Sequence, residues 1–111
     1  MWNTPNEAQI EEIPRLYETD EVPLEAKIVH LHFFIGGCDW YAVEYDGQDL
    51  FFGYAILNND CDNAEWGYFS LSELRSIKVG PGVEVDCDLY WQVRPAGQVD
   101  RNRVNLVRAA N

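Results

Sequence analysis

Runs of alternating apolar and polar residues, separated by glycine-containing turns, constrain the fold of this 111-residue chain more than any other feature. Four runs rich in β-branched and aromatic residues lie at 27–34, 40–45, 49–57 and 65–69. The first has the two-residue period of a strand with one buried face. Gly36-Gly37 and Asp46-Gly47 fall between runs and are typical of tight turns. The pattern predicts successive antiparallel hairpins.

Two capping boxes predict short helices on either side of these strands. Thr4-Pro5 fits an N-cap followed by proline at the first helical position, and Glu7 completes the box. An apolar stripe follows, which Pro14 interrupts. Ser70 and Glu73 form the second box, which predicts a helix near 71–78.

The rest of the chain predicts a fifth strand within 83–93, including Leu89-Tyr90-Trp91. Residues 99–110 have the spacing of a short amphipathic helix. We therefore expect an α+β fold, with an antiparallel β-meander of about five strands, in a single domain at 1–96. A basic tail, 97–111, follows. Neighbouring aromatic residues such as Phe51 and Phe52 face opposite ways, so the outer face needs either a covering helix or a partner, and the N-terminal helix is the simplest cover.

The chain is strongly acidic, with 19 Asp/Glu against 8 Lys/Arg and a net charge of −11. Residues 1–93 carry 18 acidic and four basic residues, whereas residues 94–111 carry four arginines and one aspartate. An acidic folded surface repels nucleic-acid backbones and anionic membranes, and it favours basic protein patches or cations. The same charge could serve solubility alone.

Carboxylates on the predicted hairpins and strands suggest an acidic face that binds a partner. Glu84, Asp86 and Asp88 alternate along one predicted strand and would share a side. The predicted face comprises Asp39, Glu44, Asp46, Asp49, Asp60, Asp62, Glu84, Asp86 and Asp88. Charges spaced along strands can imitate the phosphates of a nucleic acid. The alternative is a solvated face that discourages edge pairing.

The candidates for chemistry are sparse. His30 and His32 would share one face of a strand, as in a two-histidine metal pair, but half-exposed packing explains them equally well. The loop at 60–65 offers oxygen ligands for calcium without EF-hand spacing, so a turn held by Asx hydrogen bonds is favoured. No nucleophile or phosphate-binding motif occurs. We predict no catalysis and no cofactor.

The cysteines and the N-terminus bear on the compartment. The chain has an odd number of cysteines, Cys38, Cys61 and Cys87, and no CxxC motif. This pattern is typical of reduced thiols. No signal-peptide pattern and no stretch of about 20 apolar residues is present. We expect a cytoplasmic protein.

Several short motifs occur together in a fixed order. They are Pro14–Thr19, Lys27–Phe34, Asp39-Trp40-Tyr41, Glu44–Gly47, Phe51-Phe52-Gly53, Glu65–Tyr68, Ser72-Glu73-Leu74 and Asp86–Trp91. Over roughly residues 13–96 the chain thus resembles domain-of-unknown-function family 2958. The resemblance implies a small bacterial protein carried on plasmids, conjugative elements or phages, with no agreed activity. Cys87 stands where the family usually has arginine, so no role of that arginine carries over.

Proteins carried on mobile elements often counter host defence. This association and the acidic charge of the chain both favour a protein that binds a basic surface of a defence complex. We expect a non-catalytic inhibitor, of the anti-CRISPR or anti-restriction kind, that occupies a basic nucleic-acid-binding surface of a host complex. Two alternatives stay open. One is a small metal-dependent enzyme that uses His30 and His32. The other is an accessory module that binds nucleic acid through tail residues Arg94, Arg101, Arg103 and Arg108.

Overall fold

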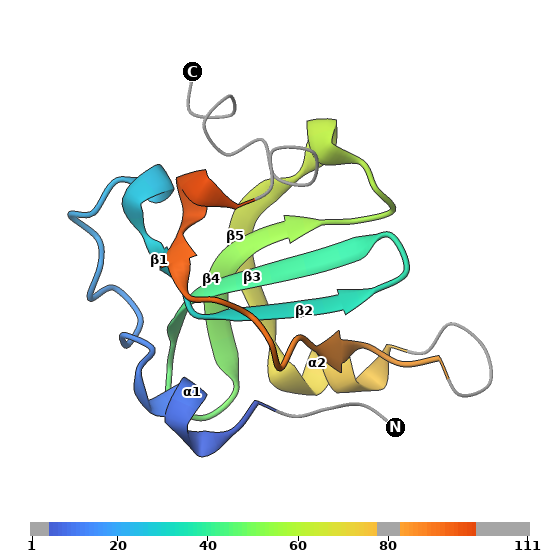
Figure 1. Cartoon of the computed structure of the whole chain (residues 1–111), viewed down its shortest axis with the longest axis horizontal. Helices are drawn as coiled ribbons and strands as arrows, with labels where there is room; N and C mark the ends of the chain where they lie inside the picture. Colours follow the sequence, from blue (N-terminus) through green and yellow to red (C-terminus); the bar gives the residue numbers. More distant parts are fainter. Residues whose placement is uncertain (1–4, 78–82, 100–111) are drawn as a thin grey trace.

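A twisted antiparallel sheet forms the centre of the computed structural model, which describes residues 5–77 and 83–99 (Figure 1). Its five strands are β2 (Leu31–Ile35), β3 (Cys38–Tyr45), β4 (Leu50–Ile56), β5 (Glu65–Ser70) and β6 (Asp86–Cys87), in the order β5-β4-β3-β2-β6. β1 (Ile28–Val29) and β7 (Arg94–Pro95) pair in a second, two-stranded sheet. The predicted α+β class and the five-stranded antiparallel sheet are confirmed.

The described residues contain two short α-helices, α1 (Glu7–Glu11) and α2 (Leu71–Ser76), and three 3-10 turns. The turns are η1 (Leu24–Ala26), η2 (Cys61–Asn63) and η3 (Ala96–Gln98). α2 begins as predicted, because the Ser70 hydroxyl accepts from the Glu73 N–H.

The predicted N-cap of α1 is wrong. Asn6 caps the helix instead of Thr4. The Asn6 side chain accepts from the Gln9 N–H, and the Gln9 side chain accepts from the Asn6 N–H, which completes a capping box. The helix predicted over 99–110 lies, apart from Val99, outside the described residues.

The hairpin between β3 and β4 shows how local chemistry builds the sheet. Gly47 has a φ of +92°, and the Asp46 carboxylate accepts hydrogen bonds from three successive backbone N–H groups after it. A β-bulge between Ala42 and Glu44 then shifts the register of β3 against β4. Opposite the bulge, a Cβ on Gly53 would overlap the Tyr41 carbonyl, so only glycine fits there.

The fifth strand of the central sheet, β6, differs from the strand predicted within 83–93. β6 has two residues and pairs with β2, at the edge of the sheet opposite β5. Leu89 and Tyr90 form a turn, and Trp91 follows it outside any strand, so these residues are not the second half of a strand. The reason is local, because the Asp88 carboxylate accepts from the Tyr90 N–H and the Asp88 carbonyl accepts from the Trp91 N–H.

One face of the sheet is covered, and the other is covered in part. One face packs against Ile13, which follows α1, and against Leu74 of α2; its core includes Leu31, Phe33, Trp40, Phe51 and Phe69. The other face, with Tyr41, Val43, Tyr54 and Ile56, packs against Val29, Ala96 and Val99. Residues 96–99 therefore cover part of the face for which the N-terminal helix was expected (Figure 1).

Candidate functional site

The nine carboxylates of the predicted acidic face have different environments. Asp39 and Glu44 are buried, with 4% and 3% of their surface exposed. Asp60 and Asp62 are exposed, and Glu84 is half-buried. Asp86 and Asp88 are half-buried and line a cleft together with Asp39. The structure thus brings three of the nine into one cleft and distributes the others around the fold.

Three of these carboxylates satisfy nearby backbone groups. Asp46 closes the β3–β4 turn, and its hydrogen bonds to Asp49, Gln48 and Leu50 hold the pKa of its carboxyl below the usual range. Asp49 accepts from the N–H and the hydroxyl of Ser72 at 2.8 and 2.6 Å. Asp60 accepts from both the backbone and the side chain of Asn63, as an Asx-held turn predicts.

The cleft has a volume of about 490 Å³ and has His32 in its wall. Nε2 of the imidazole lies 2.7 Å from Asp39 Oδ1, and Nδ1 lies 3.4 Å from Asp88 Oδ2. The ring stacks on Tyr41 at a centroid distance of 4.7 Å. A neutral imidazole has one donor, so only the imidazolium can donate to both carboxylates. Through these two contacts His32 connects β2 and β3 to the segment after β6.

His30, predicted to pair with His32 around a metal, lies between β1 and β2. Burial lowers the pKa of its imidazole, and the Glu12 carboxylate acts in the opposite direction. Within 5–77 and 83–99, no group of three or more His, Cys, Asp or Glu side chains is arranged to hold a metal ion. The pair therefore has no third ligand among these residues.

The two cysteines of this region also differ in environment. Burial, with Asp88 and Asp86 as smaller causes, raises the pKa of the Cys87 thiol to about 12. Cys38 is half-buried, and its sulfur accepts from the Asn58 N–H. A reactive thiolate needs a depressed pKa, so Cys87 is unsuited to nucleophilic chemistry.

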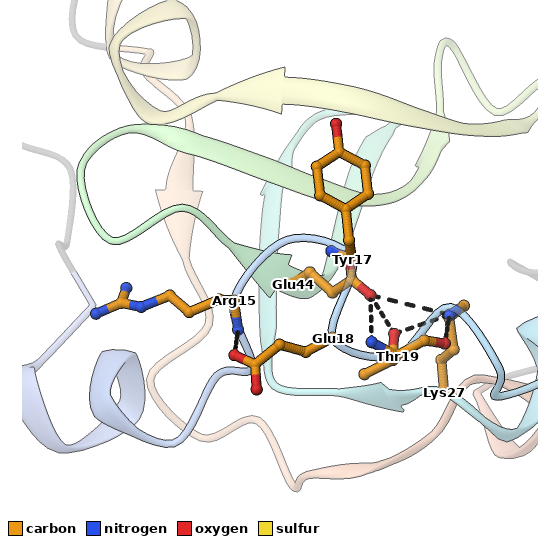
Figure 2. A network of polar contacts seen from close by, with 6 residues as sticks. All are labelled: Arg15, Tyr17, Glu18, Thr19, Lys27 and Glu44. Carbon is orange, nitrogen blue, oxygen red and sulfur yellow. Dashed lines mark hydrogen bonds and ion pairs between the residues drawn. The ribbon is translucent and has the colours of Figure 1, made fainter.

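Glu44 is the centre of a buried polar network that sequence reasoning placed on the surface (Figure 2). Its carboxylate accepts from the Tyr17 N–H at 2.9 Å and from the N–H and hydroxyl of Thr19. The Lys27 ammonium lies 3.9 Å from Glu44 Oε2 and donates to Thr19. One carboxylate thus attaches the loop before β1 to β3. The apolar residues on either side of Glu44, Val43 and Tyr45, were the available sequence signal of its burial.

The exposed carboxylates are concentrated in the N-terminal part instead. Seven lie in residues 5–27: Glu7, Glu11, Glu12, Glu18, Asp20, Glu21 and Glu25. In the same range Arg15 is exposed and Lys27 is buried. We call these seven side chains the N-terminal acidic segment.

Fold and charge together define a small acidic α+β domain. No helix in the described residues is long and apolar enough to cross a membrane. The chain belongs to the family described as Protein of unknown function (DUF2958), which matches residues 5–96 and confirms the resemblance. No curated protein and no solved structure matched the chain.

Proposed function

We propose that this protein is a non-catalytic binding protein that docks on a basic, nucleic-acid-binding protein surface. The observation that carries the proposal is the N-terminal acidic segment, with seven exposed carboxylates and one exposed cation in residues 5–27. Such a surface attracts Lys/Arg patches over several ångströms and speeds their encounter. It also disfavours direct contact with nucleic acid.

The target that fits this function is a host defence complex, such as a CRISPR or restriction complex, or another DNA-handling protein. The mobile-element setting implied by the family resemblance favours defence. Asp39 and Glu44 are buried and take no part in docking. The proposed contact therefore lies on the N-terminal acidic segment, with Asp86 and Asp88 as further candidates.

A capture experiment followed by a competition assay tests the proposal. The immobilised protein is exposed to bacterial lysate at 50 mM NaCl, and retained proteins are identified by mass spectrometry. Each retained nucleic-acid-binding protein is then purified and mixed with labelled DNA in a mobility-shift assay. We expect the protein to displace the DNA.

A matched pair of variants locates the contact. Asp20→Asn/Glu21→Gln removes two charges from the N-terminal acidic segment, and Asp62→Asn/Glu65→Gln removes two exposed charges elsewhere. We expect the first pair to weaken displacement more than the second. Displacement that both pairs leave unchanged, or a captured partner that keeps its DNA at saturating protein, would contradict the proposal.

A second candidate is acid–base chemistry in the cleft, favoured by the hydrogen bond between His32 and buried Asp39. The metal-dependent form would also require His30. Elemental analysis of the purified protein tests that form: stoichiometric zinc lost in His30→Ala would support it, and metal-free protein would argue against it. The basic-tail alternative depends on Arg94, Arg101, Arg103 and Arg108. Arg94 is half-buried in β7, with its guanidinium 4.5 Å from the centroid of the Trp91 ring, and the other three lie outside the described residues.

A further inference from the structure

Tyr17 combines an unfavourable backbone with an exposed side chain. Its φ is +73°, in the left-handed region that residues with a Cβ rarely adopt. The side chain is 64% exposed, so burial in the core does not explain why a bulky residue stands there. Strain retained at an exposed residue points to a functional constraint.

The buried Glu44 network holds this conformation. Glu44 accepts from the backbone N–H of Tyr17 and of Thr19, which fixes the turn between them. Figure 2 shows the Tyr17 ring pointing away from the Glu44 carboxylate, while Thr19 and Lys27 gather around it. The network thus orders the loop and leaves the ring displayed.

A second exposed tyrosine lies in the cross-strand row of Glu44, the residue that binds the Tyr17 backbone: Glu44 of β3 pairs with Phe52 of β4, and Phe52 pairs with Tyr68 of β5. Tyr68 of β5 is 52% exposed. The nearby Tyr17 phenol raises the pKa of the Tyr68 phenol, followed by burial and by the charges of Glu44 and Asp20. The ring of its cross-strand partner Phe52 lies 5.3 Å from the Tyr68 ring, between centroids, and Trp66 stacks on Phe52. We call Tyr17, Tyr68, Phe52 and Trp66 the tyrosine surface.

We propose that the tyrosine surface binds arginine side chains of a basic protein partner. The inference rests on the proposed function, because it says which residues would contact the basic surface of the partner. The charge is complementary, because Asp20, Glu18 and Glu21 beside Tyr17 are exposed. A guanidinium stacks on a tyrosine ring while it donates to a carboxylate, which an ammonium does less well. Tyrosine and arginine are also the residue types enriched at interface hot spots.

Two synthetic peptides of equal charge test the inference. One alternates arginine with glycine, the other lysine with glycine, and each carries a fluorophore whose anisotropy reports binding at 50 mM NaCl. We expect the arginine peptide to bind the wild type about two- to fivefold more tightly than the lysine peptide. Tyr68→Ser should abolish this preference, and Tyr68→Phe, which keeps the ring, should retain it.

Tyr17→Gly separates binding from folding. Glycine adopts a positive φ without strain, so this variant should unfold at an equal or higher urea concentration and still lose the arginine preference. Tyr90→Ser is the matched control, because Tyr90 is 92% exposed and lies outside the tyrosine surface.

Three outcomes contradict the inference, and the last of them also contradicts the proposed function. Equal binding of the two peptides by the wild type overturns the tyrosine surface but leaves charge-driven docking in place. A preference that survives both Tyr17→Gly and Tyr68→Ser, or that Tyr90→Ser removes, overturns it in the same way. Failure of the wild type to bind either peptide at 50 mM NaCl contradicts the proposed function as well.

Discussion

Buried charge is the costliest feature at the scale of single residues, and the buried charges described here have close partners. Glu44 and Lys27 are 3% and 5% exposed and lie in one network. Removing an ion from water costs several kcal/mol, so such a pair persists only when hydrogen bonds satisfy it. Here the bonds come from Tyr17 and Thr19, whose loop they attach to the sheet.

Glu44→Gln should destabilise the protein strongly. The change keeps the side-chain shape but leaves the buried Lys27 ammonium without its anion, at a cost of about 3 kcal/mol. Urea unfolding followed by tryptophan fluorescence measures the loss. Glu21→Gln, an exposed control, should change stability by less than about 0.5 kcal/mol. Equal effects of the two substitutions would show that the network adds no stability.

Cys87 should be unreactive in the folded protein. Burial raises the pKa of its thiol to about 12, so little thiolate exists at pH 8. A thiol reagent should therefore modify the same number of cysteines in native wild type and native Cys87→Ser, and one fewer in the variant under urea. Fewer modified thiols in the native variant would mean that Cys87 is accessible.

The raised pKa of the Cys87 thiol also makes the stability of the protein depend on pH in the alkaline range. The folded-state pKa lies above the ordinary value of 9.0, so the unfolded state releases its proton first as the pH rises. The contribution of Cys87 is complete below pH 9 and is lost between 9 and about 12. Cys87→Ser should remove this part of the alkaline loss of stability.

At the scale of elements, Asp49 attaches α2 to the β3–β4 hairpin. Its carboxylate accepts two hydrogen bonds from Ser72, and its carbonyl accepts from the Leu71 N–H at 2.8 Å. Asp49→Ala should cost about 1 kcal/mol, the usual value of a helix cap, in urea unfolding. Asp62→Ala, an exposed aspartate, serves as the control. An Asp49 variant as stable as this control would refute the attachment.

The sequence predicts the elements whose formation is determined by residues close together in the chain. The hairpins follow from period and turn residues, and α2 follows from the box at Ser70 and Glu73. β6 is harder to predict, because two residues pair with a strand more than 50 positions earlier. The turn after it depends on the Asp88 carboxylate, which accepts from the Tyr90 N–H, while the Asp88 N–H still donates to the His32 carbonyl of β2.

The candidate site was only partly predictable for a related reason. Exposure depends on what packs over a residue, and Glu44 is covered by a loop 25 to 27 positions earlier in the chain. Asp39 is buried against His32, which lies on the adjacent strand β2. By contrast, the exposure of Asp20 and Glu21 could be expected, since a polar loop beside a proline seldom enters a core.

At the scale of the whole molecule, the net charge of −11 acts on stability as well as on binding. Like charges repel in the compact state, and added salt screens this repulsion. Raising NaCl from 20 to 300 mM should therefore increase the thermal midpoint by a few degrees, measurable by circular dichroism. A midpoint that stays constant or falls would indicate that the surface charge is already balanced locally.

The salt dependence of binding is the most direct test of the central claim that exposed carboxylates dock on a basic protein surface. The affinity for the purified partner is measured by calorimetry at 50 and 300 mM NaCl. We predict that it falls about tenfold for the wild type, because exposed charges are screened over this range. It should fall less for Asp20→Asn/Glu21→Gln. An affinity independent of salt, or one equal in wild type and variant, would contradict the account.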